Sequence, residues 1–139
     1  MFNITNGTAI VIVSAERPQY NHAANAERSA RLERQLAQLV QRGDAFASWP
    51  GMGSYKGQQE RCFVVVALAS DAAHIAESIG PQYGQECALV IDSVQAGTLV
   101  YPDGQREAIG HVRYVTDVTG LDAYTTLDGH AGGWVVDIP

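Results

Sequence analysis

The pattern of apolar and polar positions along the chain predicts several β-strands and two helices. The strongest predictions are short, almost uninterrupted runs of aliphatic residues at positions 8–14, 62–68, 86–92 and 134–138. Continuous runs of this kind are typical of strands that are covered on both faces. Weaker patterns predict further strands at residues 45–49, 98–101 and 107–115.

Two segments have the period of an amphipathic helix. In residues 23–42 the apolar side chains recur at helical spacing, and they are Leu32, Leu36, Leu39 and Val40. Asn21 is the predicted N-cap of this helix, and Gly43 is its predicted C-terminal stop. A shorter helix is predicted at residues 72–79, ending near Gly80-Pro81.

The elements follow the order β-α-β-β-α-β, with additional strands after them. This order predicts an α+β fold with a ferredoxin-like split βαβ core, an antiparallel C-terminal strand extension and helices on one face of the sheet. The length of 139 residues predicts a single domain, 1–139. Two helices cover only one sheet face, so either the C-terminal segment or a second copy in a homo-oligomer is expected to cover the other.

Two polar segments are predicted to lie outside the regular elements. The glycine-rich segment 50–57 is interpreted as a hairpin loop. The alternative is a loop that approaches an anion through its backbone amides, beside Tyr55 and Lys56. Residues 117–132 are expected to be irregular.

Composition and charge exclude several classes of protein. Hydrophobic residues make up 46% and charged residues 17%, which excludes a disordered chain. No apolar run approaches the roughly 20 residues that span a bilayer, so a membrane protein is not expected. The net charge of −6 argues against direct binding to nucleic acid.

The expected compartment is the cytoplasm, because the N-terminus lacks the features of a secretory signal peptide. In that compartment Cys62 and Cys87 are expected to be buried thiols. The four histidines are scattered and match no metal-binding spacing. The sequence therefore predicts neither a metal site nor a cofactor.

Polar residues gather where the long helix begins. Asn25 and Arg28 continue the apolar stripe of the helix towards its N-terminus. One interpretation is structural, with a buried Arg28 paired to Glu16, Glu60 or Glu86. The other is a ligand-binding cleft lined by Glu16, Arg17, Asn21, Asn25 and Arg28. Gln85 and Glu86 would either belong to a turn with a capping role or face the same cleft.

Several short motifs occur together in a fixed order. They are Ser14-Ala15-Glu16-Arg17, Asn25-x-x-Arg28, Tyr55-Lys56-Gly57, Glu60-x-x-Phe63, Tyr83-Gly84-Gln85-Glu86 and Leu99-Val100-Tyr101-x-Asp103-Gly104. With these motifs, residues 10–110 resemble a family of small proteins of unknown function from bacteriophages and some bacteria. The resemblance implies the cytoplasm of an infected or lysogenic bacterium, and it implies no activity.

The acidic second half of the chain suggests the first of three functional hypotheses. Residues 62–139 contain two basic and ten acidic residues, a net charge of −8. We rank first a non-enzymatic anti-defence inhibitor whose acidic face, with Asp117, Asp122 and Asp128, binds a host CRISPR or restriction complex.

The other two hypotheses use the polar cleft. A nucleotide-binding or nucleotide-sequestering protein would hold phosphates on Arg17 and Arg28 and stack a base on Tyr55, with Asn25 and Lys56 nearby. A small enzyme acting on a nucleotide or a host protein would use Glu16, Glu60 or Glu86 as its base. The expected partner is thus a host protein or a phosphate-bearing small molecule.

Overall fold

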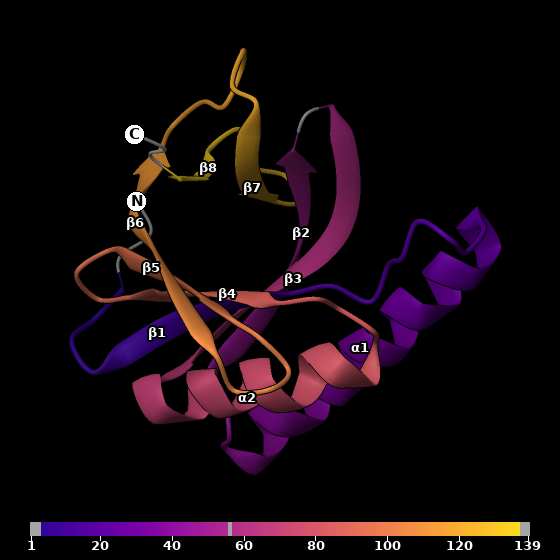
Figure 1. Ribbon diagram of the computed structural model, residues 1–139, viewed down its shortest axis with the longest axis horizontal. Coiled ribbons are helices and arrows are strands. Elements are labelled where there is room, and N and C mark those ends of the chain that lie inside the picture. The colour runs from indigo at the N-terminus through magenta and orange to yellow at the C-terminus, as the bar shows by residue number, and fades with distance from the viewer. Residues whose placement is uncertain (1–3, 56, 137–139) are drawn as a thin grey trace.

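In the computed structural model, residues 4–55 and 57–136 are described, and eight strands of this part close into an antiparallel barrel (Figure 1). The strands are β1 Thr8–Val13, β2 Ala47–Tyr55, β3 Gln58–Leu68, β4 Ala88–Asp92, β5 Ala96–Val100, β6 Arg106–Val115, β7 Ala123–Leu127 and β8 Gly133–Val136. The helices are α1 His22–Arg42 and α2 Ala69–Gln82.

The barrel overturns the prediction of a ferredoxin-like split βαβ fold. Its strand order is β1-β3-β2-β7-β8-β6-β5-β4, and β4 pairs with β1 to close the ring. Strand β7 lies within residues 117–132, which were expected to be irregular. Because β7 pairs with β2 and β8 pairs with β6, the sheet continues into a ring instead of ending at an edge.

Both faces of β1 are buried, and each faces a different core. Val11 and Val13 point outwards into a core shared with the two helices. Ile10 and Ile12 point into the barrel, where Val64 and Trp134 join them. The C-terminal strands therefore cover the second face within one chain, and the homo-oligomer stays a prediction.

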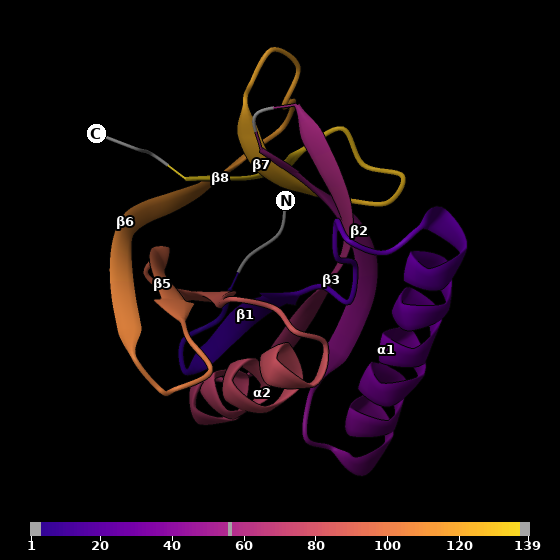
Figure 2. The same cartoon turned by 45° about the vertical axis from the view of Figure 1, so that its right-hand side comes forward.

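Both helices lie outside the barrel and pack on its strands. Figure 2 shows α2 beneath β1 and α1 alongside β3 and β2. Asn21 accepts a hydrogen bond from the Ala24 amide, and Gly43 ends α1 in the left-handed conformation, which confirms both predicted caps. Leu32 and Leu36 are fully buried against the barrel. None of the described helices is long and apolar enough to cross a membrane.

Residues 50–55 of the glycine-rich segment belong to strand β2, and only the end of the segment, at Gly57, lies in a turn before β3. Strand β2 runs through Pro50, Gly51 and Gly53, paired with β3 on one side and β7 on the other. A Cβ atom at Gly51 would collide with the carbonyl oxygen of Thr126. Glycine is needed here because two strands approach each other closely. From composition alone, a glycine-rich strand of this kind cannot be distinguished from a glycine-rich loop.

Candidate active site

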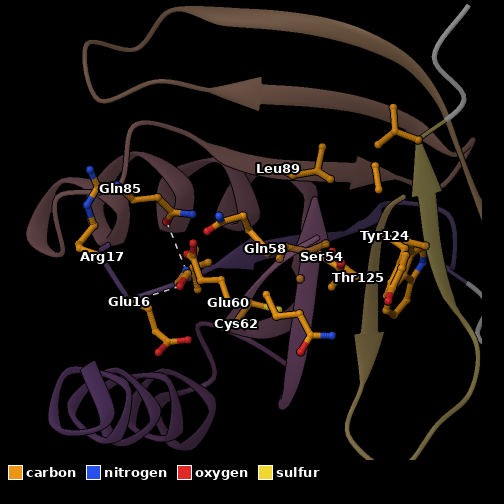
Figure 3. Close-up of a pocket in the computed structure, with 18 of the residues that line it drawn as sticks. Glu16, Arg17, Ser54, Gln58, Glu60, Cys62, Gln85, Leu89, Tyr124 and Thr125 are labelled. Atoms are coloured by element: carbon orange, nitrogen blue, oxygen red, sulfur yellow. Dashed lines mark hydrogen bonds between the residues drawn. The ribbon is translucent and has the colours of Figure 1, made fainter. Parts of the chain in front are cut away.

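A cavity of about 790 Å³ reaches from the rim of the barrel into its interior (Figure 3). Its apolar lining comes from strands on several sides of the ring, with side chains that include Ile12, Cys62, Leu89, Val112, Ala123, Trp134 and Val136. Its polar lining residues are Ser14, Glu16, Arg17, Asn25, Ser54, Gln58, Gln59, Glu60, Gln85, Tyr124 and Thr125. Glu16, Arg17 and Gln85 lie on one side of the cavity and Tyr124 and Thr125 on the other, and the side with Ser14, Glu16, Arg17 and Glu60 is called its mouth. A concave, largely apolar cavity with a few converging polar groups is typical of a small-molecule site.

The segment that follows β1 is held firmly at this mouth. The Ser14 hydroxyl donates to the carbonyl oxygen of Arg61 at 2.7 Å and accepts from the Glu16 amide at 3.2 Å. The Ser14 amide donates to the side-chain oxygen of Gln85 at 3.4 Å. The Glu16 carboxylate in turn accepts a hydrogen bond from the Arg61 amide. These bonds tie the segment to β3 and to the residues just before β4.

Asn25 fixes the next residue along the chain. Its side-chain oxygen accepts from the Arg17 amide at 2.9 Å, and its side-chain nitrogen donates to the Arg17 carbonyl at 3.0 Å. Both backbone groups of Arg17 are thus satisfied by a single amide side chain. Asn25 therefore positions Arg17 at the cavity.

Glu60 is the group at the mouth whose protonation is most affected by its surroundings. Burial raises its pKa above the ordinary value, and the nearby Glu16 carboxylate raises it further. Ser14, through a hydrogen bond, and Arg17, through its charge, partly oppose this rise in pKa. A perturbed carboxyl in a cavity is a common property of functional sites.

Cys62 forms part of the inner wall next to Glu60. Burial raises the pKa of its thiol to about 12, and the Glu60 charge contributes in the same direction. The thiol is therefore protonated at neutral pH and is a weak nucleophile. Both cysteines are free, Cys62 is buried as expected, and Cys87 is only half-buried.

The structure brings five of the predicted ligand residues to this cavity, namely Glu16, Arg17, Asn25, Glu60 and Gln85. Asn21 caps α1, and Glu86 is not among the lining residues. Lys56 and the side chain of Tyr55 lie outside the described part of the chain. Their predicted role in binding stays a prediction.

Arg28 has a structural environment that neither interpretation anticipated. Its guanidinium donates to the carbonyl oxygens of Ala15, at 2.7 Å, and Tyr83. It also lies over the rings of Tyr20 and Tyr83, with its central carbon 4.6 and 5.7 Å from their centroids. The predicted Arg–Glu bridge is absent from the ion pairs of the described residues, and the Arg28 guanidinium joins three segments through backbone oxygens.

The three aspartates of the predicted acidic face have separate surroundings. Asp128 forms an ion pair with Arg61 at 2.6 Å. Asp117 accepts hydrogen bonds from the amide and hydroxyl of Thr119, which lower its pKa. Asp122 is exposed near the start of β7. None of the three lines the cavity inside the barrel.

The residues that the last strands contribute to the cavity were not predicted from the sequence. Tyr124, Thr125 and Trp134 are far from β1 along the chain but line the same cavity. The β-branched and aromatic run at residues 123–127 was the available signal for β7. Within the described residues, no group of three His, Cys, Asp or Glu side chains is placed to hold a metal ion.

The chain is thus an antiparallel β-barrel whose interior holds a largely apolar cavity with carboxylates at its mouth. The model of the S-adenosylmethionine lyase family matches residues 11–137. The chain therefore belongs to the S-adenosylmethionine lyase family. Comparison with individually curated proteins gives no match.

Family membership corrects two interpretations of the sequence. The family is named for an enzymatic activity, so it is not one of unknown function, although all of the quoted motifs lie within its matched range. The anti-defence inhibitor of a CRISPR or restriction complex is wrong for the same reason. Nucleotide sequestration and an enzyme acting on a nucleotide or host protein fit the family no better.

Proposed function

We propose that this protein is an S-adenosylmethionine lyase and that the barrel cavity is its active site. The observation that carries the proposal is the cavity itself, in a chain of this family. It joins an apolar interior to a mouth that holds Glu16, Glu60 and Arg17.

The charges at the mouth match those of the substrate. S-adenosylmethionine has a sulfonium, an ammonium and a carboxylate, so its net charge is about +1 at neutral pH. The two carboxylates and one guanidinium of the site have the opposite net charge. A cavity of about 790 Å³ is within the range that accommodates ligands of this size.

A lyase breaks a carbon–sulfur bond without adding water. The amino-acid arm of the substrate is suited to this reaction, because its carboxylate can attack the γ-carbon to close a five-membered ring, or the adjacent carbon can lose a proton. In either route the electron pair of the broken bond passes to sulfur. The leaving group is then the neutral thioether 5′-methylthioadenosine.

The apolar walls favour this chemistry. The positive charge on sulfur disappears as the bond breaks, so the transition state is less charged than the bound substrate. Apolar walls with Leu89, Val112 and Trp134 destabilise the charged substrate more than the less charged transition state. The activation barrier is therefore lower in the cavity than in water. The substrate is an alkylating agent, and Cys62 lies in the cavity wall. Because its thiol is protonated, Cys62 is a weak nucleophile and is protected from alkylation by the substrate.

Glu60 has the role of binding the cation. Its carboxylate attracts the positive charges of the substrate, and that attraction weakens as sulfur becomes neutral. An interaction of this kind lowers KM more than it raises kcat. Glu16 has less freedom for this role, because its carboxylate already accepts a hydrogen bond from the Arg61 amide.

The direct test is to incubate the purified full chain with S-adenosylmethionine and to measure 5′-methylthioadenosine by liquid chromatography and mass spectrometry. We expect enzyme-dependent formation of this product. In Glu60→Gln we expect KM to rise about 10-fold, as for a lost charged contact, while kcat changes by less than about threefold.

The matched control is Glu27→Gln, because Glu27 is an exposed glutamate of α1 outside the cavity. This variant should keep both kinetic constants of the wild-type enzyme. Absence of 5′-methylthioadenosine with the folded wild-type protein would contradict the proposed activity. If Glu60→Gln instead lowers kcat by about two orders of magnitude or more, at unchanged KM, Glu60 acts as a general base.

A further inference from the structure

We propose that Arg17 binds the α-carboxylate of the substrate and selects sulfonium compounds that carry this group. The inference rests on the proposed function, and it concerns one end of the same site. It predicts that Arg17 does not contribute to the affinity for a sulfonium compound that lacks the carboxylate.

Arg17 is the one cationic residue among the described residues that line the cavity. Its charge is close enough to Glu60 to lower the pKa of that carboxyl. The cavity thus has a positive group and a negative group on the same rim. A zwitterionic amino-acid arm has the complementary pair of charges.

The guanidinium of Arg17 has unused hydrogen-bonding capacity. Its Nε atom is buried and, within the described residues, has no hydrogen-bond partner. Two other arginines differ, because Arg28 donates to two carbonyl oxygens and Arg61 to Gly51 and Asp128. A buried cationic donor without a partner is costly, so an anionic ligand at this position would stabilise the site.

The backbone under this side chain is unusually well fixed. Asn25 bonds both the amide and the carbonyl of Arg17, and Pro18 restricts the residue before it to an extended conformation. Because the backbone is already fixed, ligand binding has to order only the side chain of Arg17. Its planar fork fits the two oxygens of a carboxylate, which a lysine ammonium does not match.

The test measures the binding of two cationic ligands to the full chain by isothermal titration calorimetry. Sinefungin, a non-cleavable analogue, keeps the α-carboxylate and replaces the sulfonium by an amine-bearing carbon. Decarboxylated S-adenosylmethionine keeps the sulfonium and lacks the carboxylate. In Arg17→Gln we expect the Kd for sinefungin to rise roughly 10- to 100-fold and the Kd for the decarboxylated ligand to change less than about threefold.

Two further variants complete the design. Arg34→Gln removes an exposed arginine of α1 that does not line the cavity, and it should change neither Kd. Arg17→Lys keeps the charge and should weaken sinefungin binding selectively, by about three- to tenfold. If Arg17→Gln does not fold, the lysine variant carries the test, because the same selectivity for sinefungin is required of it.

The outcomes separate this inference from the proposed function. Equal losses for both ligands, or no loss for either, would overturn the role of Arg17 while the wild-type protein still converts S-adenosylmethionine. A wild-type protein that binds neither ligand and forms no 5′-methylthioadenosine would overturn the proposed function, and with it this inference.

Discussion

Burial raises the pKa of the Glu60 carboxyl, so this group ionises less readily in the folded chain than in the unfolded chain. Below the ordinary pKa of about 4.5, Glu60 is neutral in both states and has no such effect on stability. As the pH rises through the higher pKa of the folded state, ionisation favours unfolding. At neutral pH the carboxylate therefore lowers the stability of the fold.

Because the ionised Glu60 destabilises the fold, we predict that Glu60→Gln raises the melting temperature at pH 7. We expect an increase of only about 1–2 °C, because solvent at the mouth screens part of the effect. The increase should vanish below about pH 4.5, where the wild-type carboxyl is protonated. Thermal unfolding followed by circular dichroism at both pH values checks this. An equal shift at both pH values would contradict the assignment to ionisation.

Residues at the start of α1 were the most predictable part of the site. The N-cap at Asn21 and the break at Pro18 place Arg17 and Asn25 near each other from local rules alone. The partners of Arg28 were not predictable, because they are backbone carbonyls. Every residue has such a carbonyl, so the sequence contains no sign of which ones are used.

At the scale of elements, β2 shows why composition alone misplaced a strand. Gly51 and Gly133 each lie where a side chain would collide with a carbonyl oxygen of β7. Gly53 has more space, since a Cβ atom there would lie 3.7 Å from the nearest atom, the Glu60 carbonyl oxygen. Two glycines of the same strand, Gly51 and Gly53, thus differ in how strictly the structure requires them.

This difference predicts a contrast between two alanine substitutions. Gly51→Ala forces β2 and β7 apart and should destabilise the fold by about 1–3 kcal/mol, the usual cost of overpacking. Gly53→Ala should change stability by less than about 0.5 kcal/mol. Urea unfolding of the two variants measures both values. Equal destabilisation would show that the close approach at Gly51 is not what requires glycine.

At the scale of the whole molecule, the order of helices and early strands followed from periodicity, whereas barrel closure did not. The apolar runs correctly indicated that β1 is covered on both faces. Closure depends on the pairing of β2 with β7 and of β6 with β8, which joins residues far apart in the chain. Local patterns specify each strand but contain no information about which strands become neighbours.

If S-adenosylmethionine is the substrate, as proposed, the net charge of −6 favours the approach of a cation to the protein. A negative protein attracts a ligand of net charge +1 over distances near the Debye length, which is about 10 Å at 0.1 M salt. Most of the negative charge lies in residues 62–139, which contribute β4 to β8. Under the proposed function, these charges would assist substrate binding without a protein partner.

Attraction of this kind predicts a salt-dependent reaction. Between about 20 and 500 mM sodium chloride we expect kcat/KM for S-adenosylmethionine to fall about two- to fivefold, because salt screens the attraction. Replacing both Asp117 and Asp122 by Asn changes the net charge from −6 to −4 outside the cavity, and it should make this fall smaller. Initial rates at substrate concentrations well below KM measure the effect.

Uncharged 5′-methylthioadenosine is the control ligand, since long-range attraction does not act on it. If its inhibition constant changes with salt as much as kcat/KM does, salt acts on the protein itself and not on the approach of the cation.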